Sequence, residues 1–257
     1  MYCVAFVLAF AAPPAFGDDW TPPENPDPQA ILQEAREDTQ AKRFETALAK
    51  HVWFHDNALS IRPSLYGVRL SFALAYWAEL AEQYPPALTK LKEMRDQARQ
   101  EVLEGNDVRE SFHDMNAINR QFGEPAATKE VFETLDAKNP ELAKQVFDLA
   151  KPALVRAKAY SLLGKYVDPK ADFALITLTY SAGKKRADDP RFGARHLDFA
   201  NKKFANDVTT LVAILAVNDR TEEAEAIAKS ARAEWEDRAF HDGLEQALAG
   251  VVPDPWP

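Results

Sequence analysis

The chain has 257 residues, of which 46% are hydrophobic and 28% are charged, so it can bury a substantial core and is not disordered throughout. Its 40 acidic and 31 basic side chains give a formal net charge of −9 at pH 7. This balance argues against a general nucleic-acid binder and against adhesion to an anionic membrane, because both functions need clustered Lys and Arg.

Residues 1–17 have the features of a signal peptide. The segment carries no charged side chain and is apolar from Val4 to Ala12, a stretch too short to span a bilayer. Ala15 and Gly17 supply small residues at the cleavage-determining positions, so we predict cleavage after Gly17 and a secreted or periplasmic mature chain. The segment does not begin with basic residues, so either the start Met is misassigned or the segment is a weak signal; a buried N-terminal strand or helix is the alternative.

The only cysteine, Cys3, lies inside this segment. A mature chain without thiols suits an oxidising compartment and cannot use disulfides, thiolate catalysis or cysteine-based zinc sites. Residues 18–28 include TPPENPDP, which holds four prolines in eight residues and predicts an extended linker. Folded structure is expected to begin near Asp27.

Between residues 29 and 250 the pattern predicts helices almost throughout, because apolar residues recur at spacings of three and four. Residues 66–84 are predicted to form one long helix with its apolar side chains on one face. Helix breaks are expected at Pro85-Pro86, at residues 123–125 and at residues 218–220. The sequence therefore predicts an all-α domain built from helical hairpins.

Three segments resemble the second helix of tetratricopeptide repeats, in which a turn is followed by an Ala that permits close packing and by a Pro that closes the unit. They are FETAL (44–48) with ALSIRP (58–63), GEPAA (123–127) with LDAKNP (135–140), and NDRTEEAEAIA (218–228). The resemblance implies a right-handed superhelix of stacked hairpins over residues 29–250. It also implies a concave groove that binds a protein or peptide, with no catalytic residues and no cofactor.

His51 and His55, in the stretch HVWFHDNAL, are four residues apart, and two imidazoles at this spacing on a helix can bind zinc. A metalloprotease would need Glu directly after the first His, where this chain has Val52. A zinc site would also need a third ligand, for which His113 and Asp114 are the candidates by residue type. The alternatives are packing against neighbouring helices, which we favour because both histidines lie on an apolar stripe, and a pH-sensing role.

Trp53, Tyr66 and Trp77 are candidates for partner contacts. Aromatic side chains dominate the energetics of many protein interfaces, so these three could anchor a partner. Their ordinary role in a helical repeat is to pack between neighbouring helices, and this interpretation is favoured for Trp53.

A basic cluster lies within residues 181–199, where Gly, Pro and mixed charges interrupt the helix pattern and predict a long loop. Arg191 and Arg195, with the Lys184-Lys185-Arg186 run, could bind carboxylates or phosphates through charge-assisted hydrogen bonds. The alternative is a solvated loop, because Asp188 and Asp189 are interspersed among the cations.

Residues 251–257, VVPDPWP, end the helical pattern and are predicted to dock by their apolar side chains rather than extend freely. The resulting prediction is a secreted or periplasmic helical-repeat protein that binds a protein or peptide. It includes no nucleic-acid binding and no membrane span in the mature chain. A zinc-dependent enzyme built on the histidine pair and a homo-oligomeric structural module remain as alternatives.

Overall fold

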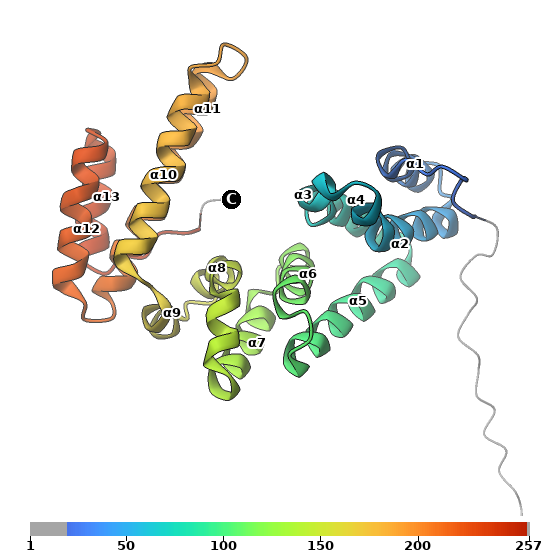
Figure 1. Cartoon of the computed structure of the whole chain (residues 1–257), viewed down its shortest axis with the longest axis horizontal. Helices are drawn as coiled ribbons and strands as arrows, with labels where there is room; N and C mark the ends of the chain where they lie inside the picture. Colours follow the sequence, from blue (N-terminus) through green and yellow to red (C-terminus); the bar gives the residue numbers. More distant parts are fainter. Residues whose placement is uncertain (1–19, 256–257) are drawn as a thin grey trace, which may run out of the picture. The chain divides into compact units, whose positions relative to one another are not determined.

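The computed structural model describes residues 20–255, and within this range the chain forms thirteen α-helices, one short 3-10 helix and no strand (Figure 1). The predicted all-α class is therefore confirmed for this part of the chain. The predicted cleavage site after Gly17 and the tail residue Trp256 lie outside the described residues. None of the described helices combines the length and the apolar content needed to cross a bilayer.

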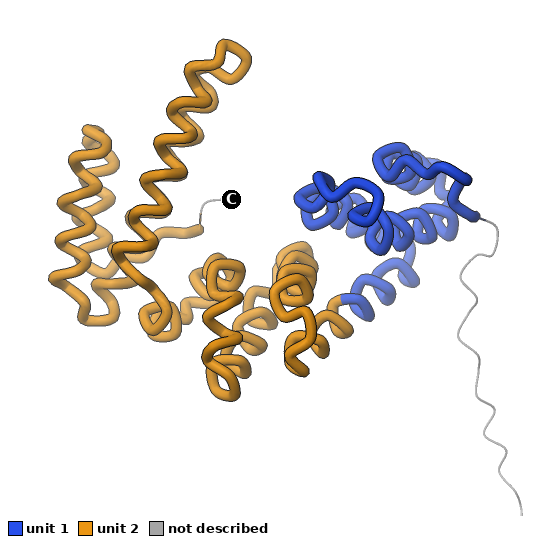
Figure 2. The backbone as a smooth tube through the Cα atoms, viewed as in Figure 1, with its two compact units in different colours: residues 1–94 blue, residues 95–257 orange. Residues whose placement is uncertain are grey.

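Backbone contacts divide the chain into two compact units, residues 1–94 and residues 95–257, where the sequence predicts one repeat domain (Figure 2). The described part of unit 1 contains α1 (Pro28–Gln40), α2 (Phe44–Ile61), a 3-10 helix (Pro63–Leu65), α3 (Tyr66–Arg69), α4 (Phe72–Ala81) and the first half of α5 (Pro85–Glu104). Unit 2 contains the rest of α5, α6 (Val108–Gln121), α7 (Pro125–Lys138), α8 (Pro140–Arg156), α9 (Tyr160–Tyr166), α10 (Pro169–Ala187), α11 (Gly193–Ala216), α12 (Thr221–Glu234) and α13 (Arg238–Leu248).

Helix α1 begins where the proline-rich segment ends, as predicted. The Oδ1 atom of Asp27 accepts a hydrogen bond from the backbone N–H of Gln29 at 2.9 Å, and Pro28 occupies the first helical position. Both features stabilise a helix N-terminus, because the side chain satisfies an exposed N–H and Pro has none to satisfy. Leu32 of α1 then packs with Phe54 and other side chains in the core of unit 1.

The predicted single helix over residues 66–84 is wrong in detail, because α3 ends at Arg69 and α4 begins at Phe72. Ser71 lies at the break, and its hydroxyl group donates a hydrogen bond to the backbone oxygen of Gly67 at 2.6 Å. A serine that bonds four residues back in this way bends a helix. Apolar spacing cannot reveal such a break.

The other predicted breaks are confirmed. Helix α4 ends at Ala81 before α5 begins at Pro85, α6 ends at Gln121 before α7 begins at Pro125, and α11 ends before α12 begins at Thr221. Proline can start a helix but cannot continue one, so two of these boundaries follow directly from proline positions.

The predicted loop over residues 181–199 is wrong. Helix α10 continues to Ala187 and α11 begins at Gly193, so only a short turn separates two long helices (Figure 1). The Lys184-Lys185-Arg186 run forms the last turn of α10, where positive charge is favourable beside the unpaired backbone carbonyl groups. In the turn, Asp189 accepts a hydrogen bond from the backbone N–H of Arg191 at 3.0 Å.

The core of unit 2 is built largely on the second half of α11, which is buried on every side. The fully buried side chains of this stretch are Val208, Leu211, Val212, Ala213, Ile214 and Leu215. They join side chains from α6 to α10, α12 and α13 in one continuous apolar cluster. A helix that is apolar all round is typical of the centre of a domain.

Helix α9 is fastened to the end of α11 by a close polar contact. The Asn218 side-chain amide donates hydrogen bonds to the backbone oxygen atoms of Tyr160 at 3.0 Å and of Ile214 at 2.7 Å. Gly164 leaves the space for this amide, since a Cβ atom there would lie 2.3 Å from Cγ of Asn218. Arg220 completes the contact by donating to the backbone oxygen of Gly164 at 3.1 Å.

The described part of the tail docks on unit 2. The side-chain amide of Asn206, in α11, donates a hydrogen bond to the backbone oxygen of Asp254 at 2.7 Å, and Val252 packs against the core of unit 2. Docking on unit 2 is confirmed for Val252, whereas Val251 is 54% exposed and the hydrogen bond is to α11 instead of to the last hairpin, where docking was expected.

Candidate functional site

The histidine pair of unit 1 lies in an interface between helices. His51 is 1% exposed, and its ring stacks on that of Trp77 at 5.7 Å between ring centroids, with an interplanar angle of 22°. Among the described residues, neither ring nitrogen of His51 has a hydrogen-bond partner. Burial therefore lowers the pKa of His51 to about 4 from its ordinary 6.5, because the charged imidazolium would lose its hydration.

His55 lies one helical turn further along α2 and is half-buried. Its ring meets Trp77 edge-on at 6.4 Å, and Nη2 of Arg69 lies 3.2 Å from its Nε2 atom. Nε of Arg69 also donates a hydrogen bond to the backbone oxygen of His55 at 3.0 Å. The partners of this ring therefore include an indole and a guanidinium group.

Across residues 20–255, no group of three or more His, Cys, Asp or Glu side chains could hold a metal ion. His113 and Asp114, the candidate third ligands, lie half-buried in α6 of unit 2, where burial lowers the pKa of His113. Within the stretch HVWFHDNAL, the buried His51 ring packs on Trp77 in unit 1.

The three candidate aromatic anchors do not form one exposed cluster. Trp77 is 1% exposed, and its indole N–H donates to the backbone oxygen of Ala87 at 3.2 Å, so its ring belongs to the core. Trp53 is half-buried, and its ring contacts that of Trp20 edge-on at 6.3 Å. Tyr66 is half-buried at the start of α3. These positions favour packing for Trp53 and Trp77.

The described residues expose apolar side chains most clearly along the hairpin formed by α10 and α11. Leu175 and Leu178 of α10 are 63% and 67% exposed, and Phe199 of α11 is 47% exposed. Phe192 and Leu197, nearer the turn, are also exposed. Leu175 and Leu178 lie one turn apart on α10, and Phe192 and Phe199 share one face at the start of α11, whereas Leu197 lies on another face of that helix.

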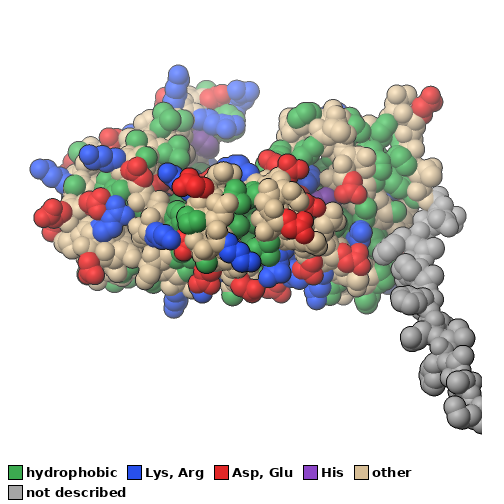
Figure 3. All heavy atoms as spheres, turned by 60° about the horizontal axis from the view of Figure 1, so that its bottom comes forward, with side chains coloured by type: hydrophobic (Ala, Val, Ile, Leu, Met, Phe, Trp, Pro, Cys, Tyr) green, Lys and Arg blue, Asp and Glu red, His purple; other side chains and the backbone are tan. Residues whose placement is uncertain are grey.

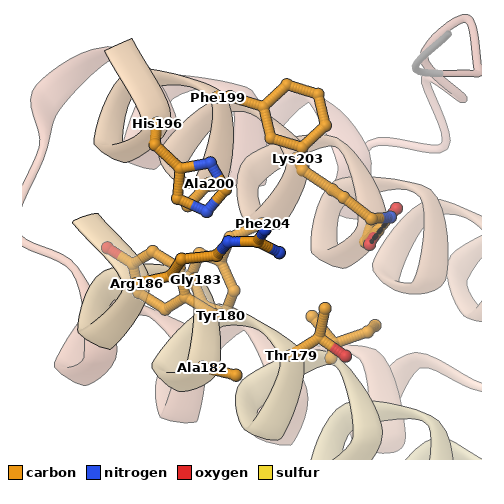
Figure 4. A pocket seen from close by; sticks show the side chains of 12 residues that line it. Thr179, Tyr180, Ala182, Gly183, Arg186, His196, Phe199, Ala200, Lys203 and Phe204 are labelled. Atoms are coloured by element: carbon orange, nitrogen blue, oxygen red, sulfur yellow. Dashed lines mark hydrogen bonds and ion pairs between the residues drawn. The ribbon is translucent and has the colours of Figure 1, made fainter. Parts of the chain in front are cut away.

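A cavity of about 300 Å³ lies between these two helices, and we call it the hairpin groove. Its lining includes Tyr180, Gly183 and Arg186 from α10, and His196, Phe199 and Phe204 from α11 (Figure 4). A volume of this size accommodates one or two bulky side chains of a ligand and is at the small end of the range for ligand pockets.

The floor of the hairpin groove is aromatic and rigid. The rings of Tyr180 and Phe204 stack at 4.2 Å between centroids, and the hydroxyl of Tyr180 donates a hydrogen bond to Oδ1 of Asn201 at 2.9 Å. Beside them, Gly183 allows the helices to approach closely, since a Cβ atom there would lie 2.9 Å from Cβ of Ala200. Ring stacking, a hydrogen bond and close helix packing therefore shape the groove.

Cationic side chains stand at the mouth of the hairpin groove. Figure 4 shows the guanidinium group of Arg186 and the imidazole ring of His196 directed into the same space from the two helices. The guanidinium carbon of Arg186 also lies 4.4 Å from the ring centroid of Phe192, within cation–π distance. Lys203, two turns after His196 on α11, is paired with Asp207 at 2.7 Å.

The predicted ligand residues Arg191 and Arg195 lie at the turn end of the hairpin. They line a shallow depression together with Phe192, His196 and Phe199. The Arg191 guanidinium is bound to the Asp189 carboxylate at 2.6 Å, whereas Arg195 is exposed. The structure therefore brings both predicted arginines next to the hairpin groove, although on helices and a short turn instead of a long loop.

A second cavity, of about 360 Å³, adjoins the hairpin groove and shares Ile176, Lys203 and Asp207 with it. Its lining includes Asp172, whose pKa is raised by burial and whose Oδ2 atom lies 3.8 Å from Nζ of Lys151. Paired acidic and basic side chains thus line the end of the hairpin that is distant from the turn, and exposed cations mark the turn end.

Searches against protein-family models, curated proteins and solved structures each find no match. The function is therefore inferred from the chemistry of the hairpin groove. Figure 3 shows acidic and basic side chains interspersed over the face it displays, so the basic turn of the hairpin is a local feature.

Because residues 181–199 were predicted to form a loop, the sequence did not indicate that aromatic side chains from this region line a groove. A signal is nevertheless present, because Phe192, His196, Phe199 and Lys203 follow helical spacing and would lie on one face of a helix. Gly193 and the charged residues around it obscure that periodicity.

Proposed function

We propose that this chain is a helical-repeat protein, similar in architecture to tetratricopeptide-repeat proteins, that binds a protein or peptide partner at the hairpin groove of unit 2. The right-handed superhelical order of the hairpins and a concave binding surface are parts of this proposal. The observation that carries it is the aromatic cavity between α10 and α11, beside which the side chains of Leu175 and Phe199 are exposed.

Exposed apolar side chains in one place favour a binding function. Soluble proteins usually scatter their exposed apolar residues, and a contiguous group with a polar or charged rim is typical of an interaction site. Leu175, Phe192 and Phe199 line the hairpin groove or the cavities beside it, and two further exposed side chains, Leu178 and Leu197, lie elsewhere on the same hairpin. Covering them with a partner would stabilise a complex by removing apolar area from water.

We expect the full chain, immobilised and presented with a displayed library of random peptides, to enrich peptides that depend on the hairpin. The double variant Leu175→Ser and Phe199→Ser should lose most of that binding, because it removes exposed apolar area beside the hairpin groove from both helices. Both side chains are exposed, so the variant is expected to remain folded.

The matched control is Phe72→Ser in unit 1, since Phe72 is 63% exposed in α4 and loses the same kind of apolar surface. It should bind the enriched peptides as well as the unaltered chain does. Failure to enrich any peptide, or equal loss with the control variant, would overturn the proposed site.

Secretion or periplasmic export is a second part of the proposal, supported by the apolar stretch from Val4 to Ala12 and the small residues before Asp18. Fusing residues 1–25 to a reporter that is active only after export should give activity, and N-terminal sequencing of the exported product should begin at Asp18. Replacing Leu8 with Arg should abolish export by interrupting the apolar stretch. Retention of the unaltered fusion inside the cell would contradict this assignment.

A further inference from the structure

At the turn end of the hairpin, basic side chains outnumber the acidic side chains that could neutralise them. Among the described residues, no carboxylate forms an ion pair with Lys185, Arg186 or Arg195, all of which are exposed. Arg191 is matched by Asp189, and Asp188 is left as the one acidic side chain of the turn without a described ion pair. This local excess of cations occurs in a chain whose formal net charge is −9.

The opposite end of the same hairpin holds paired charges. Asp172 and Asp207 line the adjoining cavity together with Lys151 and Lys203. Lys203 pairs with Asp207 at 2.7 Å, and Nζ of Lys151 lies 3.8 Å from Oδ2 of Asp172. An acidic ligand would therefore be attracted to the turn end more strongly than to this end.

The apolar floor lies between these two charged ends. The stacked rings of Tyr180 and Phe204 line the cavity, and Arg186 reaches it from the turn side. A ligand that fills the cavity with an apolar side chain would place its neighbouring groups within reach of this guanidinium, which can bind a carboxylate through two parallel hydrogen bonds.

We propose that the hairpin groove binds an acidic peptide segment that carries a bulky apolar side chain, seated on Tyr180 and Phe204, with its carboxylates against Arg186 and Arg195. This inference rests on the proposed function and specifies its ligand. A membrane surface fits less well, because Leu175 and Leu178 lie well away from the turn along α10, where insertion of the turn into a lipid surface would not bury them.

The test uses the full chain and three short synthetic peptides of equal length, followed by fluorescence anisotropy. One carries a single Trp flanked by Glu, the second the same Trp flanked by Lys, and the third Ala flanked by Glu. The Glu–Trp peptide should bind at least about tenfold more tightly than the other two, and its affinity should fall as salt is added.

Arg186→Gln is expected to weaken binding of the Glu–Trp peptide about tenfold, because a charge-assisted contact is lost. The matched control is Arg238→Gln, which removes the same charge from a side chain that is 96% exposed in α13. It should leave the affinity unchanged. Circular dichroism spectra that superimpose for both variants and the unaltered chain would exclude a folding defect.

Equal binding of the Lys–Trp peptide, or equal loss in the two arginine variants, would overturn this inference while leaving peptide binding itself intact. Absence of binding by all three peptides would overturn it as well. Two further arms separate other occupants: sedimentation with phosphatidylserine vesicles would indicate a membrane, and a mass that rises with protein concentration would indicate a second copy of the chain. Either result without peptide binding also contradicts the proposal.

Discussion

Acidification from about pH 7 to about pH 4 is expected to reduce the free energy of unfolding of unit 1 by about 3 kcal/mol through His51 alone. The pKa of this buried imidazole is lowered from 6.5 to about 4 in the folded chain. Between these two values the unfolded chain binds a proton that the folded chain excludes, so stability rises with pH across this window and is lost as pH falls. Below about pH 4 both states are protonated and the contribution of His51 levels off.

Hydrogen exchange followed by mass spectrometry can measure this effect locally, on fragments from α2 and α4. The matched variant is His51→Phe, which retains a planar ring against Trp77 and leaves no buried nitrogen without a partner. We expect it to be as stable as the unaltered chain at neutral pH or more stable, and to lose the pH dependence in that window. The same loss of protection in both proteins on acidification would show that carboxylates, and not His51, cause it.

Gly164→Ala is expected to destabilise unit 2 by about 3 kcal/mol, although an Ala in a helix ordinarily adds stability. The new Cβ atom would overlap the side-chain amide of Asn218, where 2.3 Å separates the two positions. The amide must then leave, and its hydrogen bonds to Tyr160 and Ile214 are lost. Chemical denaturation of the full chain, monitored by circular dichroism, measures the change.

A double-mutant cycle isolates the contact between Gly164 and Asn218. Asn218→Ala alone should cost about 2 kcal/mol, because the backbone oxygen of Tyr160 loses its donor. In that background Gly164→Ala should be neutral or stabilising, since the overlap no longer exists. Gly67→Ala is the control, because nothing lies within 4 Å of a Cβ atom there. Additive effects of the two changes would contradict the proposed contact.

The spacing of apolar residues predicts the helices well. A helix that packs on one side places apolar residues three and four positions apart, and this pattern is easily recognised in a sequence. Prolines at positions 85 and 125 also predict helix starts, since Pro lacks the N–H that a helix interior requires. The break at Ser71 is different, because a single side-chain hydrogen bond causes it and the apolar pattern continues through it.

The candidate site was less predictable, for two physical reasons. The sequence pattern around the basic run at residues 184–186 predicts a solvated loop. In the structure these residues form the last turn of α10. The position of Trp77 in the sequence fits an exposed anchor and a core residue equally well. Its burial between α2 and α5 shows that it is a core residue. Arg191 and Arg195 were predicted as ligand-binding residues because of their charge. The structure shows that they have aromatic neighbours, which the predicted loop did not indicate.

Helix α11 is a single uninterrupted helix of 24 residues whose first half lines the hairpin groove and whose second half is the centre of unit 2. A ligand held at the turn therefore contacts the same helix that carries the run from Val208 to Leu215. If a partner binds only the folded hairpin, its binding is thermodynamically linked to the folding of this core. Its affinity can then be measured as a rise in the melting temperature of the chain. The hairpin thus makes the stability of the whole unit a reporter of occupancy, even for a partner that has not been identified.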